Sequence, residues 1–294
     1  DVQRRQMTTV PGDNVFNLAV EGSFDDCQRI VKAAFADQSF LPEERQLVAV
    51  NSINWARILM QIVYYFSAAL RLGAPDQLVS FSVPTGNFGD IFAGYLAKCM
   101  GLPIDRLVVA TNKNDILHRF ISNNEYSVTS LSETFSPSMD ILVSSNFERY
   151  LFDLFDLDAA DLSDFMSRFG NETLSVTEQQ WQRVKNCFDS ASVDDDTTCA
   201  VIAEVFKENG KLLDPHTAVG VKAGRICSHD KTVPVITLAT AHPAKFSEAI
   251  AAAGLAVPKL PEHLSDLFER EERYTVVPNE IIEVTNFIKN HFRH

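Results

Sequence analysis

The chain has 294 residues, of which 46% are hydrophobic and 22% are charged, a composition typical of a globular protein with one large domain or two smaller ones. Its formal net charge is −13, from 26 Lys and Arg against 39 Asp and Glu. This acidic balance argues against a nucleic-acid backbone or an anionic membrane as partner, although one local site can still bind a small anion.

The five cysteines are odd in number, and none of them forms a C-x-x-C pair. We therefore expect free thiols in a reducing, cytoplasmic compartment. No apolar stretch approaches the roughly 20 residues that cross a bilayer, so we expect no membrane partner. The scattered histidines show no H-x-x-x-H spacing, and we predict no metal site.

The first part of the chain reads as half of a βαβ unit. A short strand is predicted at residues 14–22, and an amphipathic helix at 23–37 follows it, with Ser23 as a candidate N-cap. We assign residues 1–50 to the remainder of a smaller α/β lobe.

A long helix is predicted at residues 52–72, where the sequence is apolar nearly all round the helix, which implies deep burial. Strands are then predicted at 77–83 and 106–111, with a helix rich in small residues at 89–101 between them. The order strand, helix, strand with short turns predicts a parallel sheet in an α/β protein.

Acidic helical stretches fill residues 146–210 and show no strand pattern, so we expect a helical insertion there. Sheet signals return at 232–240, a late edge strand is predicted at 273–278, and an amphipathic helix at 279–292 ends the chain. We assign residues 51–294 to a second α/β lobe that contains the insertion.

The turn "PTGNFGD", from Pro84 to Asp90, follows a predicted strand and opens a predicted helix. Backbone N–H groups are unpaired at such a position and lie at the positive end of the helix dipole, which favours a phosphate. Gly86 and Gly89 let a ligand approach the backbone, and Asn87 adds a side-chain donor. The turn matches neither G-x-G-x-x-G nor Walker A. A tight turn that needs glycine only for steric reasons is the alternative.

A second polar cluster, in "TLATAHPAKF", places Thr240, His242 and Lys245 directly after a buried strand. Ligands of open α/β sheets bind beyond the carboxyl ends of the strands, so Thr240 belongs to the same edge as the glycine turn. The alternative is that Thr240 or Ser247 only caps the following helix.

Other polar residues stand near predicted helix starts. His216 follows Asp214 and Pro215, where it could touch a substrate or simply belong to a capped helix start. Arg57 could pair with an anion or form an ordinary salt bridge, and Asn112 follows a strand at the same sheet edge.

Eight segments, in order and over nearly the whole chain, go beyond such patterns. They are "QMTTV", "AVEGSFDDCQRIVK", "NSINWARILMQIVYYF", "VPTGNFGDIFAGYLAKCMGLP", "ATNKNDILHRF", "SPSMDILVSSNFERYLF", "LLDPHTAVGV" and "TAHPAKF". Together they resemble the threonine synthases of the longer bacterial and fungal type. Only residues 158–210 lack a recognisable motif.

This resemblance implies a fold type II, tryptophan-synthase-β-like α/β fold and pyridoxal 5'-phosphate as the cofactor. It implies the conversion of O-phospho-L-homoserine and water to L-threonine and phosphate, with residues 51–294 as the cofactor-binding lobe. It also implies that Thr240 hydrogen-bonds the pyridine nitrogen. The residues that it implies for the cofactor phosphate are Gly86, Asn87, Phe88, Gly89 and Asp90. Candidate substrate residues, chosen by location, are Asn54, Arg57, Asn112, Arg149 and His216.

Two family motifs do not occur in these 294 residues: the Schiff-base lysine in an S-F-K-D-like motif, and an A-T-S-G-D-T-G-like loop. Both precede "QMTTV" in the family. We therefore expect a C-terminal portion that is inactive alone, with no catalytic residue of its own, and whose partner is the N-terminal part of the same enzyme. The alternatives are a related phospho-lyase that gives a 2-keto acid, or a non-catalytic binding remnant.

Overall fold

The structure is a computed structural model that describes residues 2–22, 24–51 and 54–291. Two compact units divide the chain: residues 1–49 together with 259–294, and residues 50–258. Residues 259–294 were expected in the second lobe but belong to the first unit, because a strand near the C-terminus pairs with a strand of that unit. The proposed N-cap Ser23 lies outside the described residues.

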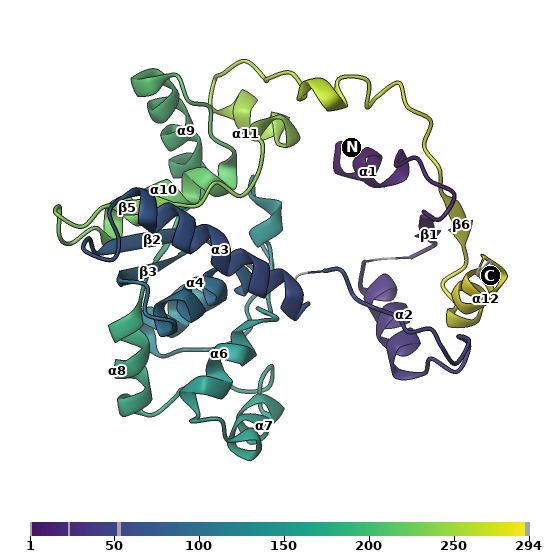
Figure 1. Ribbon diagram of the computed structural model, residues 1–294, viewed down its shortest axis with the longest axis horizontal. Helices are drawn as coiled ribbons and strands as arrows, with labels where there is room; N and C mark the ends of the chain where they lie inside the picture. Colours follow the sequence, from purple (N-terminus) through teal and green to yellow (C-terminus); the bar gives the residue numbers. More distant parts are fainter. Residues whose placement is uncertain (1, 23, 52–53, 292–294) are drawn as a thin grey trace. The chain divides into compact units, whose positions relative to one another are not determined.

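The first unit is small. Its elements are α1 (Val2–Thr8), β1 (Leu18–Val20), α2 (Phe24–Ala36), the short 3-10 helix η3 (Glu262–Leu264), β6 (Thr275–Val277) and α12 (Ile281–His291). The late strand predicted at 273–278 is β6, and it pairs in parallel with β1 (Figure 1). Ile30, Val277 and Val284 form a small buried core between this sheet and the two longer helices.

The second unit is a layered α/β structure around a parallel sheet (Figure 1). Its elements are α3 (Trp55–Arg71), β2 (Val79–Pro84), α4 (Gly89–Cys99), β3 (Ile104–Thr111), α5 (Ile116–Asn123), η1 (Pro137–Met139), α6 (Phe147–Leu154), α7 (Ala159–Ser167), α8 (Glu178–Cys187), β4 (Phe188–Ser192), α9 (Asp195–Asn209), α10 (Pro215–Cys227), β5 (Val235–Thr237), η2 (Pro243–Lys245) and α11 (Ser247–Ala252).

The strand order is β4-β3-β2-β5, and all three pairs are parallel, as the sequence predicted for this part of the chain. Every residue of β2 is buried, because β2 is central and is covered on both faces. Helix α10 packs against all four strands, and α3 packs against α4. The carboxyl ends of β2, β3 and β5 therefore meet at one edge of the sheet.

The prediction of a purely helical insertion at 146–210 was wrong, because β4 lies within it. This strand pairs with β3, with Phe188 opposite Leu107. Its sequence "FDSAS" carries no run of β-branched residues, and its two buried side chains, Phe188 and Ala191, give too weak a pattern to indicate a strand.

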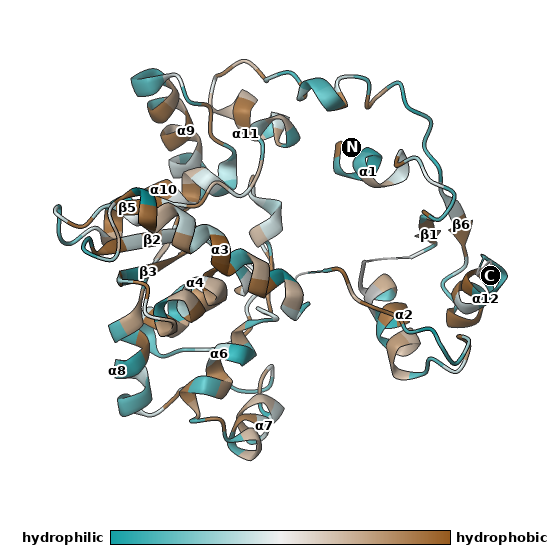
Figure 2. Cartoon of the chain, in the orientation of Figure 1, coloured by the Kyte–Doolittle hydropathy of each residue, from teal (hydrophilic) through white to brown (hydrophobic). Residues whose placement is uncertain are grey.

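Deep burial all round α3 was expected, and within these 294 residues only one face of the helix is buried. Ile58, Ile62 and Tyr65 are buried along one face of the helix, whereas 69% of Met60 is exposed on another. Hydrophobic residues recur along α3 (Figure 2), but in the described part of the chain only one face of the helix is packed. Among the described residues, no helix combines the length and the apolar character needed to cross a membrane.

Candidate functional site

The candidate site is the connection between β2 and α4. Strand β2 ends at Pro84 and α4 begins at Gly89, so only four residues join them. Thr85 fixes the start of this loop: its N–H donates to the Ala110 carbonyl at 2.8 Å, and its hydroxyl donates to the Val83 carbonyl at 2.6 Å. The loop thus leaves the sheet at its carboxyl edge.

Phe88 sets the backbone conformation at the end of the loop. It has φ of 62°, in the left-handed region, and a bulky residue in that region costs about 1–3 kcal/mol. Only 1% of Phe88 is exposed, and its ring packs against Phe147 and Phe188 with centroids 5.1 and 5.7 Å away. The buried ring offsets the strain, so the side chain anchors the loop while the backbone turns into α4.

Unpaired backbone donors gather where this loop enters α4. Among the described residues, the N–H groups of residues 86–91 find no acceptor, and the first bond of the helix runs from the Phe92 N–H to the Phe88 carbonyl at 3.0 Å. No side chain caps this helix. The positive end of the dipole of α4 and these donors together suit an anion, above all a phosphate.

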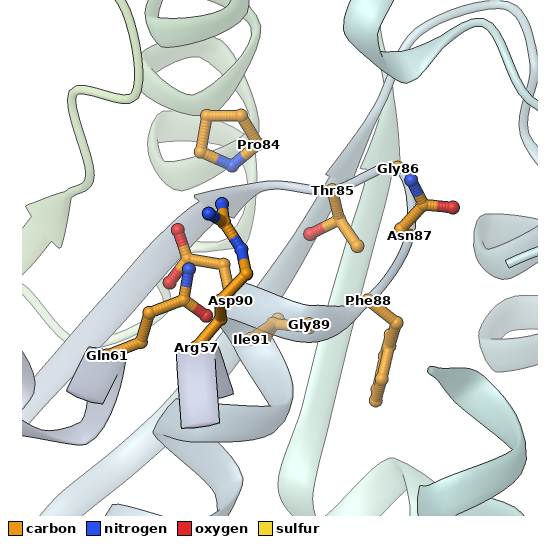
Figure 3. A pocket seen from close by; sticks show the side chains of 10 residues that line it. All are labelled: Arg57, Gln61, Pro84, Thr85, Gly86, Asn87, Phe88, Gly89, Asp90 and Ile91. Carbon is orange, nitrogen blue, oxygen red and sulfur yellow. The ribbon is translucent and has the colours of Figure 1, made fainter. Parts of the chain in front are cut away.

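A cavity of about 160 Å³ opens at these donors. Its lining residues are Arg57, Gln61, Pro84, Thr85, Gly86, Asn87, Phe88, Gly89, Asp90 and Ile91. Arg57 and Gln61 reach it from α3, one helical turn apart, and Figure 3 shows their side chains on the same side of the loop as that of Asp90. Arg57 is exposed, and its guanidinium makes no ion pair with a described carboxylate, so it can pair with an incoming anion.

Hydrogen bonds from the segment before α6 hold the carbonyl side of the loop. The Ser144 hydroxyl donates to the Gly86 carbonyl at 2.8 Å. The backbone N–H and the side-chain amide of Asn146 both donate to the Asn87 carbonyl at 3.0 Å, and Ser145 donates to the Asn87 side chain at 3.2 Å. With its carbonyl oxygens engaged in this way, the loop keeps its N–H groups for a ligand.

Asp90 stands in the first turn of α4 and is bound by α3. Its carboxylate accepts hydrogen bonds from the hydroxyls of Tyr64 and Tyr65, the latter at 3.1 Å. Burial raises the pKa of the Asp90 carboxyl above its ordinary value of 3.8, and the two tyrosine hydrogen bonds partly oppose this rise. The same burial raises the pKa of both tyrosine hydroxyls, which therefore remain donors.

Thr240 lies three residues beyond β5, at the same sheet edge as the loop, because β5 pairs with β2 up to Thr237. Its side chain is exposed and makes no hydrogen bond to the described residues. Its neighbour His242 accepts from the Ala244 N–H at 3.2 Å and so caps η2, the role that the alternative gave to Thr240 or Ser247. The cofactor role of Thr240 stays a prediction.

Three of the candidate substrate residues hold protein groups at this edge. The Asn112 amide donates to Asp140 at 2.8 Å and its oxygen accepts from the Asn114 N–H at 2.9 Å. Asn54 caps α3 by accepting from the Ala56 N–H at 2.9 Å. The Arg149 guanidinium lies over the ring of Trp55, 5.6 Å from its centroid, and Nε donates to Asn146 at 3.2 Å. Their substrate roles stay predictions.

His216 is 3% exposed and lies between two protein partners. Its Nδ1 is 2.9 Å from Asp214 Oδ1, and its Nε2 accepts from the Ser138 N–H at 3.2 Å. Asp214 is the N-cap of α10, as the pattern "LLDPHT" indicated. The ring therefore faces the protein interior, and of the five candidate substrate residues only Arg57 lines the cavity.

Several residues of this site were not predicted from the sequence. Gln61 follows Arg57 by four residues and shares its helix face, a spacing that could have indicated it. Ser138, Ser144 and Ser145 carried no local signal, because their role depends on contacts with residues far away in the chain.

Comparison with known proteins shows what this chain is similar to. A family model described as threonine synthase, C-terminal, matches residues 217–288. The threonine synthase of Pseudomonas aeruginosa is 60% identical over 293 residues, which cover 99% of this chain and 62% of that protein. The Corynebacterium glutamicum threonine synthase is 43% identical over 294 residues, which cover 97% of this chain and 61% of that protein.

Solved structures agree with the sequence matches. The pyridoxal-phosphate-bound threonine synthase from Brucella melitensis superposes with a TM-score of 0.92 at 48% identity, over 99% of this chain and 63% of that one. The yeast threonine synthase superposes with a TM-score of 0.87 at 38% identity, over 99% of this chain and 62% of that one. The chain thus spans about three-fifths of the length of the relatives it matches, and the expected fold type II α/β fold is confirmed. Over 97–99% of its length, this chain is similar to threonine synthases.

Proposed function

We propose that the whole protein to which these 294 residues belong is a threonine synthase that converts O-phospho-L-homoserine and water to L-threonine and phosphate with pyridoxal 5'-phosphate as cofactor. The observation that carries the proposal is the row of unpaired N–H groups at residues 86–91, in a chain 60% identical to a threonine synthase. The anion site and the family resemblance coincide at this loop.

The residues present fit the phosphate of this cofactor. The N–H groups of residues 86–91 have no acceptor among the described residues, the loop lines the cavity, and Arg57 adds a positive charge at its wall. The cavity of about 160 Å³ has room for a phosphate group. We therefore propose that Gly86, Asn87, Gly89 and their neighbours bind the phosphate.

Pyridoxal phosphate supplies an electron sink that stabilises negative charge on the carbon atoms of a bound amino acid. The chain's own contribution is binding and orientation. The loop at residues 86–90 would fix the phosphate end, and the Thr240 hydroxyl, exposed beyond β5, would hydrogen-bond the pyridine nitrogen. Phe88 would act through its backbone, because its ring is buried in the core.

Arg57 is the candidate that the geometry favours for an anionic group of the substrate or cofactor, since it is exposed and lines the cavity. The other four candidates do not line this cavity, and we propose that they act by holding protein groups in place. They are Asn54, Asn112, Arg149 and His216.

The proton transfers of such a reaction need a base within hydrogen-bond reach of the substrate. No lysine of this sequence stands in an S-F-K-D-like motif. We propose that the lysine lies on a segment of the whole protein outside these 294 residues, as the greater length of the relatives suggests. The 294 residues alone should then give no turnover.

The test is product analysis after incubation with O-phospho-L-homoserine and pyridoxal phosphate. We expect the whole protein to release threonine and phosphate in equal amounts, and the 294-residue chain to release neither. Formation of 2-oxobutyrate without threonine would favour a phospho-lyase instead. Threonine formation by the 294 residues alone would contradict the proposed location of the base.

A further inference from the structure

We propose that His216 is a positioning residue that holds the turn at 136–139 against Gly86 and thereby shapes the phosphate loop. This inference rests on the proposed function, because the loop matters only if it binds the cofactor phosphate. It gives His216 a task that differs from direct contact with the substrate, and its basis is a chain of contacts that runs from α10 to the loop.

The first link is between α10 and the imidazole. Asp214 is 1% exposed and caps α10, and its Oδ1 lies 2.9 Å from His216 Nδ1. Asp214 also accepts from the backbone N–H groups of His216 and Thr217, at 3.0 and 3.4 Å. The start of α10 therefore fixes the Asp214 carboxylate, and this carboxylate fixes the imidazole ring of His216.

The second link runs from the imidazole to the turn. His216 Nε2 lies 3.2 Å from the Ser138 backbone nitrogen, which can only donate. Nε2 must therefore be the acceptor, and the ring proton is on Nδ1, from which it is donated to Asp214. The ring also packs against Phe246, with centroids 4.6 Å apart, so neither its tilt nor its position is free.

The third link joins the turn to the loop. The carbonyl oxygen of the same Ser138 lies so close to Gly86 that a Cβ on Gly86 would be 2.7 Å from it, and 3.3 Å from the Met139 Cα. Ser138 thus donates a hydrogen bond to His216 through its N–H, and its carbonyl forms the wall behind Gly86. Because packed protein interiors leave few voids, we expect a shift of the turn by a few tenths of an ångström to move the loop or to open a gap behind it.

Burial separates this role from a direct one. His216 is 3% exposed, and both of its ring nitrogens are engaged by protein groups. A residue placed in this way affects a ligand through the geometry that it imposes, as the outer partners of metal and cofactor sites do. The effect should fall on the phosphate end of the cofactor, because that is the part nearest Gly86.

The experiment compares the affinity of the whole protein for pyridoxal 5'-phosphate and for pyridoxal, which lacks the phosphate. The dissociation constant of pyridoxal divided by that of pyridoxal 5'-phosphate isolates the phosphate contribution, and this ratio is large when the phosphate is bound well. His216→Met removes the strong acceptor, and His216→Gln keeps one at similar reach. Thr198→Val in α9 is the matched control, since it deletes another buried hydrogen bond, from the Thr198 hydroxyl to the Asp194 carbonyl at 2.8 Å.

We expect His216→Met to lower the ratio about tenfold, His216→Gln to restore it to within about threefold, and Thr198→Val to leave it unchanged. A folded His216→Met variant with the wild-type ratio would overturn the inference alone. A wild-type protein that binds both compounds equally would overturn the proposed phosphate site as well. If His216→Met does not fold, His216→Phe, which keeps a planar ring against Phe246, replaces it with the same expected loss.

Discussion

Replacing Gly86 with alanine tests the geometry of the loop. The added Cβ would lie 2.7 Å from the Ser138 carbonyl oxygen and 3.3 Å from the Met139 Cα, and both are backbone atoms that cannot turn aside. Overpacking of this kind costs about 1–3 kcal/mol. Either the turn at 136–139 or the loop must move, and a moved loop changes the positions of its N–H groups.

Two measurements separate these consequences: urea unfolding for stability, and the dissociation constant of pyridoxal 5'-phosphate for the site. We expect Gly86→Ala to lose about 1–3 kcal/mol of unfolding free energy and to bind the cofactor at least about tenfold more weakly.

Gly210→Ala is the control for the effect of an added methyl group. Gly210 has φ of 72° at the end of α9, where an added Cβ meets nothing within 4 Å. Its alanine variant should lose about 1–2 kcal/mol through backbone strain and keep the cofactor affinity. A Gly86→Ala variant with wild-type stability and wild-type affinity would refute the close approach of the turn to the loop.

Three further predictions concern the walls of the same cavity. Arg57→Ala should weaken binding of pyridoxal 5'-phosphate about tenfold, and this loss of affinity should be smaller at high salt. Arg71 is exposed at the far end of the same helix, and Arg71→Ala should leave the affinity unchanged in the same titration. The raised pKa of Asp90 means that the folded state retains a proton that the unfolded state has lost, so stability falls as the pH rises above 3.8. The urea-unfolding free energy of wild type minus that of Asp90→Asn should therefore decrease as the pH rises above 3.8. A difference that grows with pH would contradict this sign. Ser144→Ala removes the 2.8 Å hydrogen bond to the loop and should cost about 1 kcal/mol of unfolding free energy, against little for the exposed Ser167→Ala.

Local patterns predicted the part of the fold that carries the site. The run "VSFSVP" before "TGNFGD" and the small-residue helix after it indicate β2, the loop and α4, because a buried central strand and a glycine turn both leave strong local signals. The anion preference of the turn also follows from local backbone chemistry, and the unpaired N–H groups at residues 86–91 agree with it.

Long-range contacts account for what the sequence did not reveal. Strand β4 is an edge strand with few buried side chains, and the pairing of β1 with β6 joins the two ends of the chain. The exposed face of α3 shows that hydrophobic periodicity says which residues are apolar but not what covers them. The contacts that support the loop from Ser144 and His216 span 58 and 78 residues, beyond the reach of any local pattern.

The most direct test of the central claim is the change in backbone amide chemical shifts when the isotopically labelled protein is titrated with pyridoxal 5'-phosphate, with pyridoxal as the comparison. We predict that the amides of residues 86–91 shift most, and that they shift far less with pyridoxal, because their N–H groups bind the phosphate. Equal shifts with both compounds, or shifts that leave residues 86–91 unchanged, would contradict the assignment of this loop as the phosphate site.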